Sequence, residues 1–232
     1  MKENILHVAF FLDGYTLKKV NDYYRNHHQY HSRIDFRGLK NWVQINAMRL
    51  YGEKCESLEM ESHYYHPNKD PHIYQRNSEG FAKFEGELKN AGYQVHYNVA
   101  GNEGGCTPNM LMMEDALVFA SFKKMDVAVV MSTQGNFAAL PDRLGMMGVP
   151  TIVLGWEFRY NRGPLTVCWK TDRFLKKNCS HYIAMEKEAD DDISLGSTPK
   201  GWFFQRQNPF RNGRKSARHF CKDTSMSRNG AA

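Results

Sequence analysis

Blocks of apolar residues alternate with amphipathic stretches along most of the chain. Continuous apolar runs, typical of strands buried on both faces of a parallel sheet, occupy residues 5–12, 127–131 and 150–154. Shorter strands are predicted at residues 61–66, 93–98, 165–169 and 181–185. Apolar residues at helical spacing predict helices at residues 17–24, 35–51 (with Asp35 as N-cap), 74–90, 108–123, 137–147 and 171–177. This alternation predicts one three-layer, Rossmann-like α/β domain with a mainly parallel sheet.

The charge is concentrated at the C-terminal end of the chain. The whole chain has a net charge of +6, whereas residues 196–232 hold eight Lys or Arg and one Asp, so the remainder is close to neutral. The acidic stretch 186–192 is predicted to be a solvated run that ends the domain. We therefore divide the chain into a domain at residues 1–190 and a basic, partly disordered tail at residues 191–232.

The tail combines cations with aromatic side chains. Its Trp and Phe residues stand among five candidate nucleic-acid contacts: Arg206, Arg211, Arg214, Lys215 and Arg218. Such a mixture neutralises phosphates and stacks on unpaired bases. The alternative is a solubilising extension whose aromatic side chains pack on the domain.

Cysteine usage and hydropathy indicate a cytoplasmic protein. The five cysteines are odd in number and form no Cys-x-x-Cys pair, which favours reduced thiols. No run approaches the ~18 apolar residues of a membrane span, and the N-terminus lacks the pattern of a signal peptide. We expect no membrane partner.

Polar side chains follow two of the apolar strands. Asp13 ends the first, and the loop after residue 131 holds Ser132, Thr133, Gln134 and Asn136. Ligands of open α/β sheets bind at the carboxyl ends of the strands, so these residues are candidates for a site. The loop contains amides and hydroxyls but no acid, and an amide offers Mg²⁺ or Mn²⁺ a dipole where a carboxylate offers charge.

Four segments in order resemble a NYN domain of the LabA-like group, within the PIN-like nuclease superfamily. They are residues 11–17 (FLDGYTL), 105–117 (GCTPNMLMMEDAL), 126–137 (DVAVVMSTQGNF) and 144–153 (LGMMGVPTIV). The resemblance covers residues 5–185 and implies a PIN-like fold and a Mg²⁺- or Mn²⁺-dependent ribonuclease. Asp13 matches the first catalytic aspartate and Asp115 a second acid, so both are candidate catalytic residues and metal ligands.

The chain departs from the family pattern where the metal charge should lie. Asn109 replaces the aspartate that opens a helix, and Gln134 and Asn136 replace the paired aspartates of the Ser-Gly-Asp-x-Asp motif. Thr133 stands for a glycine of that motif, and Thr16 for an asparagine. We therefore expect a metal ion to be weakly bound or absent. The groove residues Thr16, Asn109, Ser132, Thr133, Gln134 and Asn136 would still hydrogen-bond phosphates and bases.

The leading hypothesis is a pseudonuclease that binds RNA or another single-stranded nucleic acid. One alternative is an active ribonuclease that uses Asp13 and Asp115, with Glu114 or Glu103 and substrate phosphates completing the metal ligands. Another is a protein-interaction module with a vestigial groove, and a homodimer or a protein partner is left open. Structural roles are also open: a turn at Asp13, an N-cap at Asn136 and a structural acid at Asp115. The histidines at 27, 28, 31, 63 and 66 are predicted to be surface residues, not zinc ligands.

Overall fold

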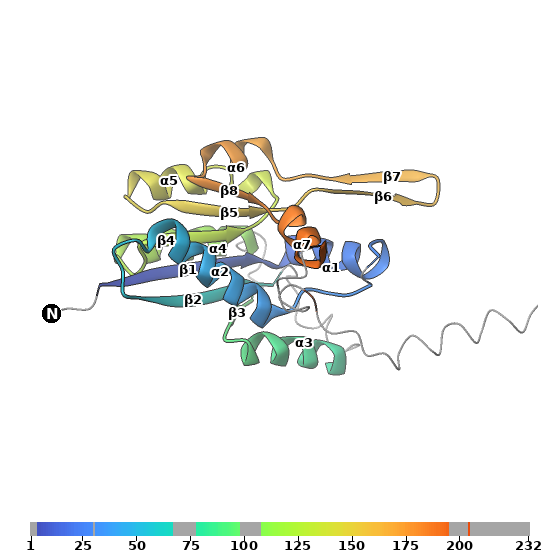
Figure 1. Ribbon diagram of the computed structural model, residues 1–232, viewed down its shortest axis with the longest axis horizontal. Helices are drawn as coiled ribbons and strands as arrows, with labels where there is room; N and C mark the ends of the chain where they lie inside the picture. Colours follow the sequence, from blue (N-terminus) through green and yellow to red (C-terminus); the bar gives the residue numbers. More distant parts are fainter. Residues whose placement is uncertain (1–3, 30, 67–77, 98–107, 195–203, 205–232) are drawn as a thin grey trace, which may run out of the picture.

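The computed structural model describes residues 4–29, 31–66, 78–97, 108–194 and 204, and it confirms the three-layer, Rossmann-like α/β prediction (Figure 1). All strands of the main sheet are parallel, in the order β3-β2-β1-β4-β5-β8. Their bounds are β1 (Ile5–Asp13), β2 (Ser57–Tyr65), β3 (Gln94–His96), β4 (Val127–Met131), β5 (Thr151–Gly155) and β8 (His181–Ala184). The chain adds β2 and β3 on one side of β1, then returns to place β4 on the other. The topological switch point therefore lies between β1 and β4.

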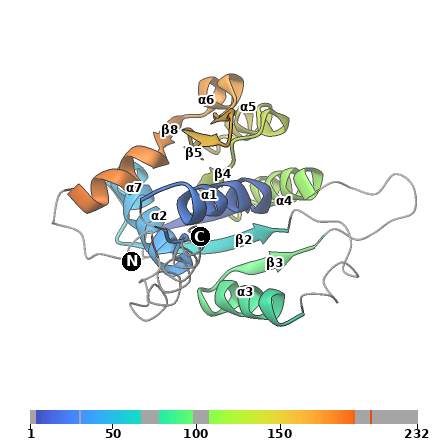
Figure 2. The same ribbon diagram turned by 90° about the vertical axis from the view of Figure 1, so that its right-hand side faces the viewer.

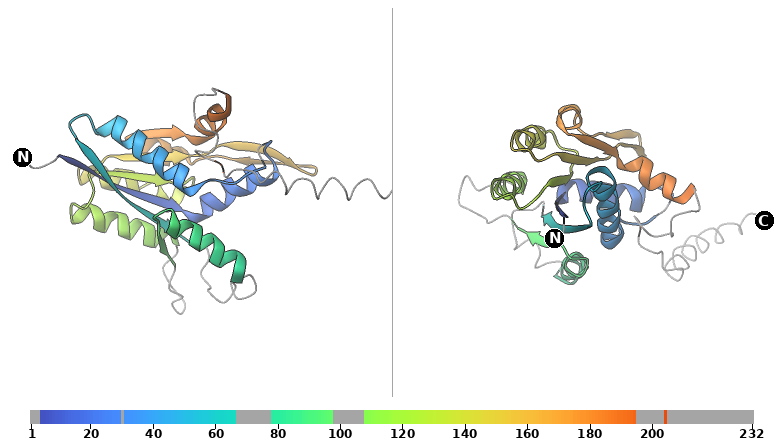
Figure 3. Two further views of the ribbon diagram at one scale, coloured as in Figure 1. Left: turned by 60° about the horizontal axis from the view of Figure 1, so that its bottom comes forward. Right: turned by 60° about the vertical axis from the view of Figure 1, so that its left-hand side comes forward.

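Helices cover both faces of the sheet (Figure 3). One face packs against α1 (Gly14–Asn26), α2 (Phe36–Tyr51), α3 (Ser78–Asn90) and α7 (Met185–Ser194). The other packs against α4 (Pro108–Ser121), α5 (Leu140–Met146) and α6 (Arg173–Asn178). Alternate residues of β1 feed the two cores: Phe10 and Leu12 one, Ala9 and Phe11 the other. This is why the strand reads as one continuous apolar run.

The predicted helix starts are partly right. Asp35 caps α2, because its side chain accepts a hydrogen bond from Gly38 N at 2.8 Å. Asn136 does not cap the predicted helix at 137–147. A short 3₁₀ turn, η2 (Gly135–Phe137), comes first, and α5 then starts after Ala139 without a side-chain cap.

A two-stranded hairpin lies outside the main sheet. The strand predicted at 165–169 is β7 (Leu165–Trp169), and it pairs antiparallel with β6 (Phe158–Arg162), which the sequence analysis missed. Gly163 has a φ of 59° at the first position of the connecting turn, where the II′ hairpin turn requires a positive φ. Figure 1 shows the hairpin extending beyond the carboxyl edge of the sheet, on the side of α1.

The acidic stretch is solvated in part, as predicted, since Glu188 and Asp190 are exposed, but it is also a helix with a buried side that the sequence did not indicate. It forms α7, in which Met185 and Ala189 are fully buried. Asp190 accepts a hydrogen bond from the Tyr24 hydroxyl at 3.2 Å. Burial first, and then the charge of Asp190, raise the pKa of Tyr24 well above its usual value. The helix therefore belongs to the packed domain.

The structure also bears on the predictions for the tail and for the cysteines. Phe204 is buried against Tyr24 with ring centroids 4.7 Å apart, whereas the five tail cations lie outside the described residues. Cys55, Cys168 and Cys179 are free thiols. Every helix in the described part of the chain is too short or too polar to cross a bilayer.

Candidate functional site at the carboxyl edge of the sheet

Asp13 lies at the switch point, where β1 passes directly into α1. Its carboxylate caps the helix: Oδ1 accepts from Tyr15 N at 2.9 Å and Oδ2 from Thr16 N at 3.3 Å. The residue is 2% exposed. A carboxylate here satisfies orphan amides and interacts favourably with the positive end of the helix dipole. Capping of α1 is thus a structural reason for the aspartate in the local sequence Asp-Gly-Tyr-Thr.

Side chains from the β4 loop donate to the same carboxylate. Ser132 Oγ lies 3.0 Å and Gln134 Nε2 2.7 Å from Asp13 Oδ2. Thr16 Oγ1 donates to that oxygen at 2.7 Å. The ends of β1 and β4 are thereby joined through one buried anion, and the structure brings four predicted groove residues together around it: Thr16, Ser132, Thr133 and Gln134.

The threonines extend this network to the hairpin. The hydroxyl of Thr16 donates its hydrogen bond to Asp13. The hydroxyls of Thr16 and Thr133 are 3.1 Å apart, so the hydroxyl of Thr133 must be the donor in that contact. Thr133 Oγ1 in turn accepts from Trp169 Nε1 at 3.1 Å. The resulting chain runs from Trp169 through Thr133 and Thr16 to Asp13. Each bond polarises the next, and all of them stabilise the negative charge.

The residues around Asp13 do not fit a Mg²⁺ or Mn²⁺ ion. Such ions need oxygen lone pairs, usually from carboxylates and substrate phosphates. Here the lone pairs of Asp13 Oδ2 face hydroxyl and amide protons, and Gln134 presents its NH₂ group in place of a carbonyl. Metal binding would have to break several charge-assisted hydrogen bonds, each of which stabilises the fold by about 1.5–3 kcal/mol. Among the described residues, no three His, Cys, Asp or Glu side chains gather as a metal site.

Asp115 belongs to a neighbouring cluster. Its Oδ2 accepts from the Tyr65 hydroxyl at 2.8 Å and lies 3.7 Å from His96 Nδ1. His96 Nε2 in turn lies 3.0 Å from Nδ1 of His63. Tyr65 is the register partner of Asp13 in the β1–β2 pair, so the two clusters adjoin at the same edge. Asp115 is thus bonded to a neighbouring element, as the structural interpretation of this acid expects.

Two histidines were wrongly predicted to lie on the surface. His63 is 2% exposed and stacks on Phe11, and His66 is 7% exposed. Burial first, and then the nearby His96, lower the pKa of His63 to about 4. Isolated histidines carry little pattern, and only the tertiary fold shows that His63 in β2 and His66 directly after it turn inward.

A hollow of about 530 Å³ opens over the β4 loop. It is lined by Tyr15, Thr133, Gln134, Gly135, Asn136, Cys168, Trp169 and Lys170. The rings of Tyr15 and Trp169 lie 5.9 Å apart, and Lys19 Nζ is 5.5 Å from each ring centroid. A second hollow of about 550 Å³ shares Tyr15 and continues along α1 past Lys18, Lys19 and Arg25. Figure 2 looks onto this side of the molecule.

Sequence reasoning missed the aromatic part of the site. Tyr15 stands directly after the Asp-Gly turn, and Trp169 ends a predicted strand, so both could have been found from their positions. Asn136 is exposed and lines the hollow. Glu103 and the side chain of Asn109 lie outside the described residues.

No family model and no curated protein matches the chain. A solved structure similar to it is that of a protein of unknown function from Vibrio parahaemolyticus, with a TM-score of 0.51 and 18% identity. The match covers 80% of this chain and 96% of that chain. At this identity the likeness concerns the fold alone, and it agrees with the three-layer α/β architecture.

Proposed function

We propose that the chain binds single-stranded nucleic acid, RNA in the first place, at the carboxyl edge of its sheet. In this proposal it is a NYN or PIN-like domain in which a protein hydrogen-bond network replaces the metal site. The ordered motifs at residues 11–17, 105–117, 126–137 and 144–153 support the family. The donors that surround Asp13 support the loss of metal-dependent cleavage.

The lining of the hollow is the observation that carries the proposal. Its described residues combine two aromatic rings, two side-chain amides and a lysine, without a carboxylate. Aromatic side chains stack on unpaired bases, and amides hydrogen-bond base edges and phosphates. An active metal site would instead expose acids that repel a polyanion once the metal leaves. The arrangement at this edge therefore suits retention of a strand better than its hydrolysis.

Binding is tested with a fluorescent 12-nucleotide RNA in EDTA, followed by anisotropy. Tyr15→Ala should weaken binding by roughly 5- to 150-fold, because loss of one stacking platform costs about 1–3 kcal/mol. Phe122→Ala is the matched control, since this ring is 71% exposed and follows α4 toward the opposite edge of the sheet. Equal affinities of the two variants would contradict the proposed groove.

Cleavage is tested with the same RNA in Mn²⁺, Mg²⁺ and EDTA. We expect no product from the native chain. Cleavage that requires metal and disappears in Asp13→Ala would replace the proposal with an active ribonuclease. Absence of both binding and cleavage would favour a protein-interaction module.

A further inference from the structure

The β6–β7 hairpin is a sheet separate from the main one, and aromatic contacts hold it against the rest of the domain. Its inner face packs on α1: Phe158 stacks on Tyr23 with centroids 4.4 Å apart, and Tyr160 stacks on His27 at 3.9 Å. An isolated hairpin is at best marginally stable in water, so these contacts fix its direction. The hairpin is thus a preorganised extension of the carboxyl edge.

Its outer face is polar and continuous with the hollow. Arg159, Asn161, Thr166 and Cys168 are exposed, and they alternate with the aromatic and apolar residues of the inner face. Arg159 pairs across the strands with Cys168, which lines the hollow together with Lys170. Asn161 pairs with Thr166, whose Oγ1 donates to Asn161 Oδ1 at 3.0 Å.

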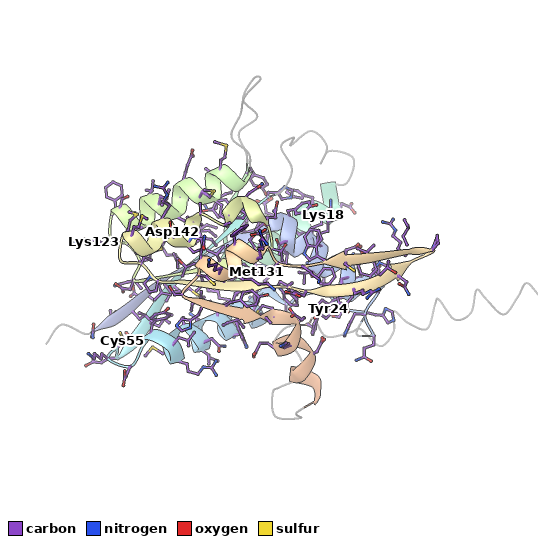
Figure 4. The ribbon with its side chains drawn as sticks, turned by 90° about the horizontal axis from the view of Figure 1, so that it is seen from above. Lys18, Tyr24, Cys55, Lys123, Met131 and Asp142 are labelled. Carbon is purple, nitrogen blue, oxygen red and sulfur yellow. The ribbon has the colours of Figure 1, made fainter. Side chains whose placement is uncertain are left out.

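All charged side chains of the hairpin are positive. Residues 158–170 contain Arg159, Arg162 and Lys170 and no acidic residue. Lys170 follows directly after β7, and at the usual strand rise it lies about 13 Å along the chain from Thr166. In Figure 4 the hairpin and Lys18 of α1 lie on one side of Met131, the last residue of β4, whereas Lys123 and Cys55 mark the opposite end.

We infer that the outer face of the hairpin is a second binding surface, which holds the sugar–phosphate backbone of the single strand whose bases occupy the hollow. Lys170 and Arg159 neutralise its phosphates near the hollow, and Asn161 and Thr166 hydrogen-bond the backbone farther along the hairpin, towards its turn. This inference rests on the proposed function. A flexible strand needs such a surface, because contacts to phosphates fix its register while the bases are held elsewhere.

The test compares oligonucleotides of two lengths. Anisotropy is measured in EDTA over a salt series with oligouridylates of 4 and 12 nucleotides and with a 12-nucleotide oligothymidylate. Arg159→Glu should weaken binding of both 12-mers roughly tenfold, as expected for one lost charge-assisted contact. The slope of log K against log salt should fall by about 0.7, the value for one phosphate of a single strand. The 4-mer fills the hollow alone and should change by less than twofold.

Arg143→Glu in α5 is the matched control, because it makes the same change of charge at an exposed arginine beside Asp142, which Figure 4 shows far from the hairpin. Arg159→Ala repeats the test without a new negative charge, and thermal melting confirms folding of each variant. If Arg159→Glu weakens binding of the 4-mer and the 12-mers equally, or if Arg143→Glu has the same effect, the hairpin is not a backbone-binding surface. Binding of bases in the hollow would be unaffected by that result. If the native chain binds none of the oligonucleotides, the proposed function fails and the inference with it.

Discussion

Replacing Asp13 by alanine tests whether this carboxylate holds the fold together or is kept for chemistry. The substitution removes the cap of α1 and the acceptor for Thr16, Ser132 and Gln134. Thr16 and Ser132 are fully buried, so their hydroxyls lose a partner where little water reaches them. The structure therefore predicts a large loss of stability at a position where a free catalytic acid would cost little.

The magnitude follows from the separate contacts. Loss of a helix N-cap costs about 1 kcal/mol. Three side-chain hydrogen bonds to a buried carboxylate contribute about 1.5 kcal/mol each. Rotation of the hydroxyls and entry of water recover part of this, so we expect a loss of about 3–5 kcal/mol. For a chain of this size, that corresponds to a fall in Tm of roughly 10 °C.

Urea unfolding followed by circular dichroism measures this difference. The matched control is Asp35→Ala, because Asp35 also caps a helix but joins no such network, and this variant should lose only about 1 kcal/mol. The difference between the two variants isolates the contribution of the network around Asp13.

Equal losses of unfolding free energy in Asp13→Ala and Asp35→Ala would refute a stabilising role of the network around Asp13. So would an Asp13→Ala protein that is more stable than the native chain, since removal of a strained active-site charge often stabilises a protein.

Three further predictions concern other parts of the molecule. Gln134→Asp should lower Tm in EDTA, because it places a second carboxylate beside Asp13. Differential scanning fluorimetry should show that millimolar Mn²⁺ raises the Tm of this variant and leaves the Tm of the native chain unchanged. His63 has a folded-state pKa of about 4, below its ordinary 6.5, so its stabilising effect is complete above pH 6.5 and is lost as the pH falls towards 4. Urea titrations over this range should show a decline of up to about 3 kcal/mol that is reduced in His63→Gln, and parallel curves would exclude His63 as its source. Gly155→Ala should cost about 1–3 kcal/mol, because its Cβ would collide with the Tyr182 ring; an unchanged urea midpoint would show that the ring moves aside freely.

The architecture was predictable because its signals are local. The apolar runs of β1, β4 and β5 are each buried along most of their length, which alone indicates a sheet covered on both faces. Asp35 was recognised as a cap because the signal consists of one residue and its immediate neighbours. The candidate residues at the ends of β1 and β4 met because parallel strands bring their carboxyl ends to one edge.

Local pattern failed where burial depends on a distant partner. The residues of β6 alternate between aromatic and polar, but the strand is fixed by stacking on α1, more than a hundred residues earlier. The acidic stretch was expected to be a solvated run because its charges dominate the sequence; Glu188 and Asp190 are exposed, but the helix and its buried side were not foreseen. It packs as α7 because Met185 and Ala189 face the core.

The sequence by itself determined which chemical groups stand at the carboxyl edge: one aspartate at the end of β1, and hydroxyls and amides after β4. Only the tertiary structure decided that Gln134 turns its NH₂ group towards Asp13, 121 positions away, and that Trp169 joins the same network through Thr133. The physical reason is that a hydrogen bond depends on the direction of individual atoms. Residue order specifies donors and acceptors, whereas the packing of strands and helices decides which of them meet.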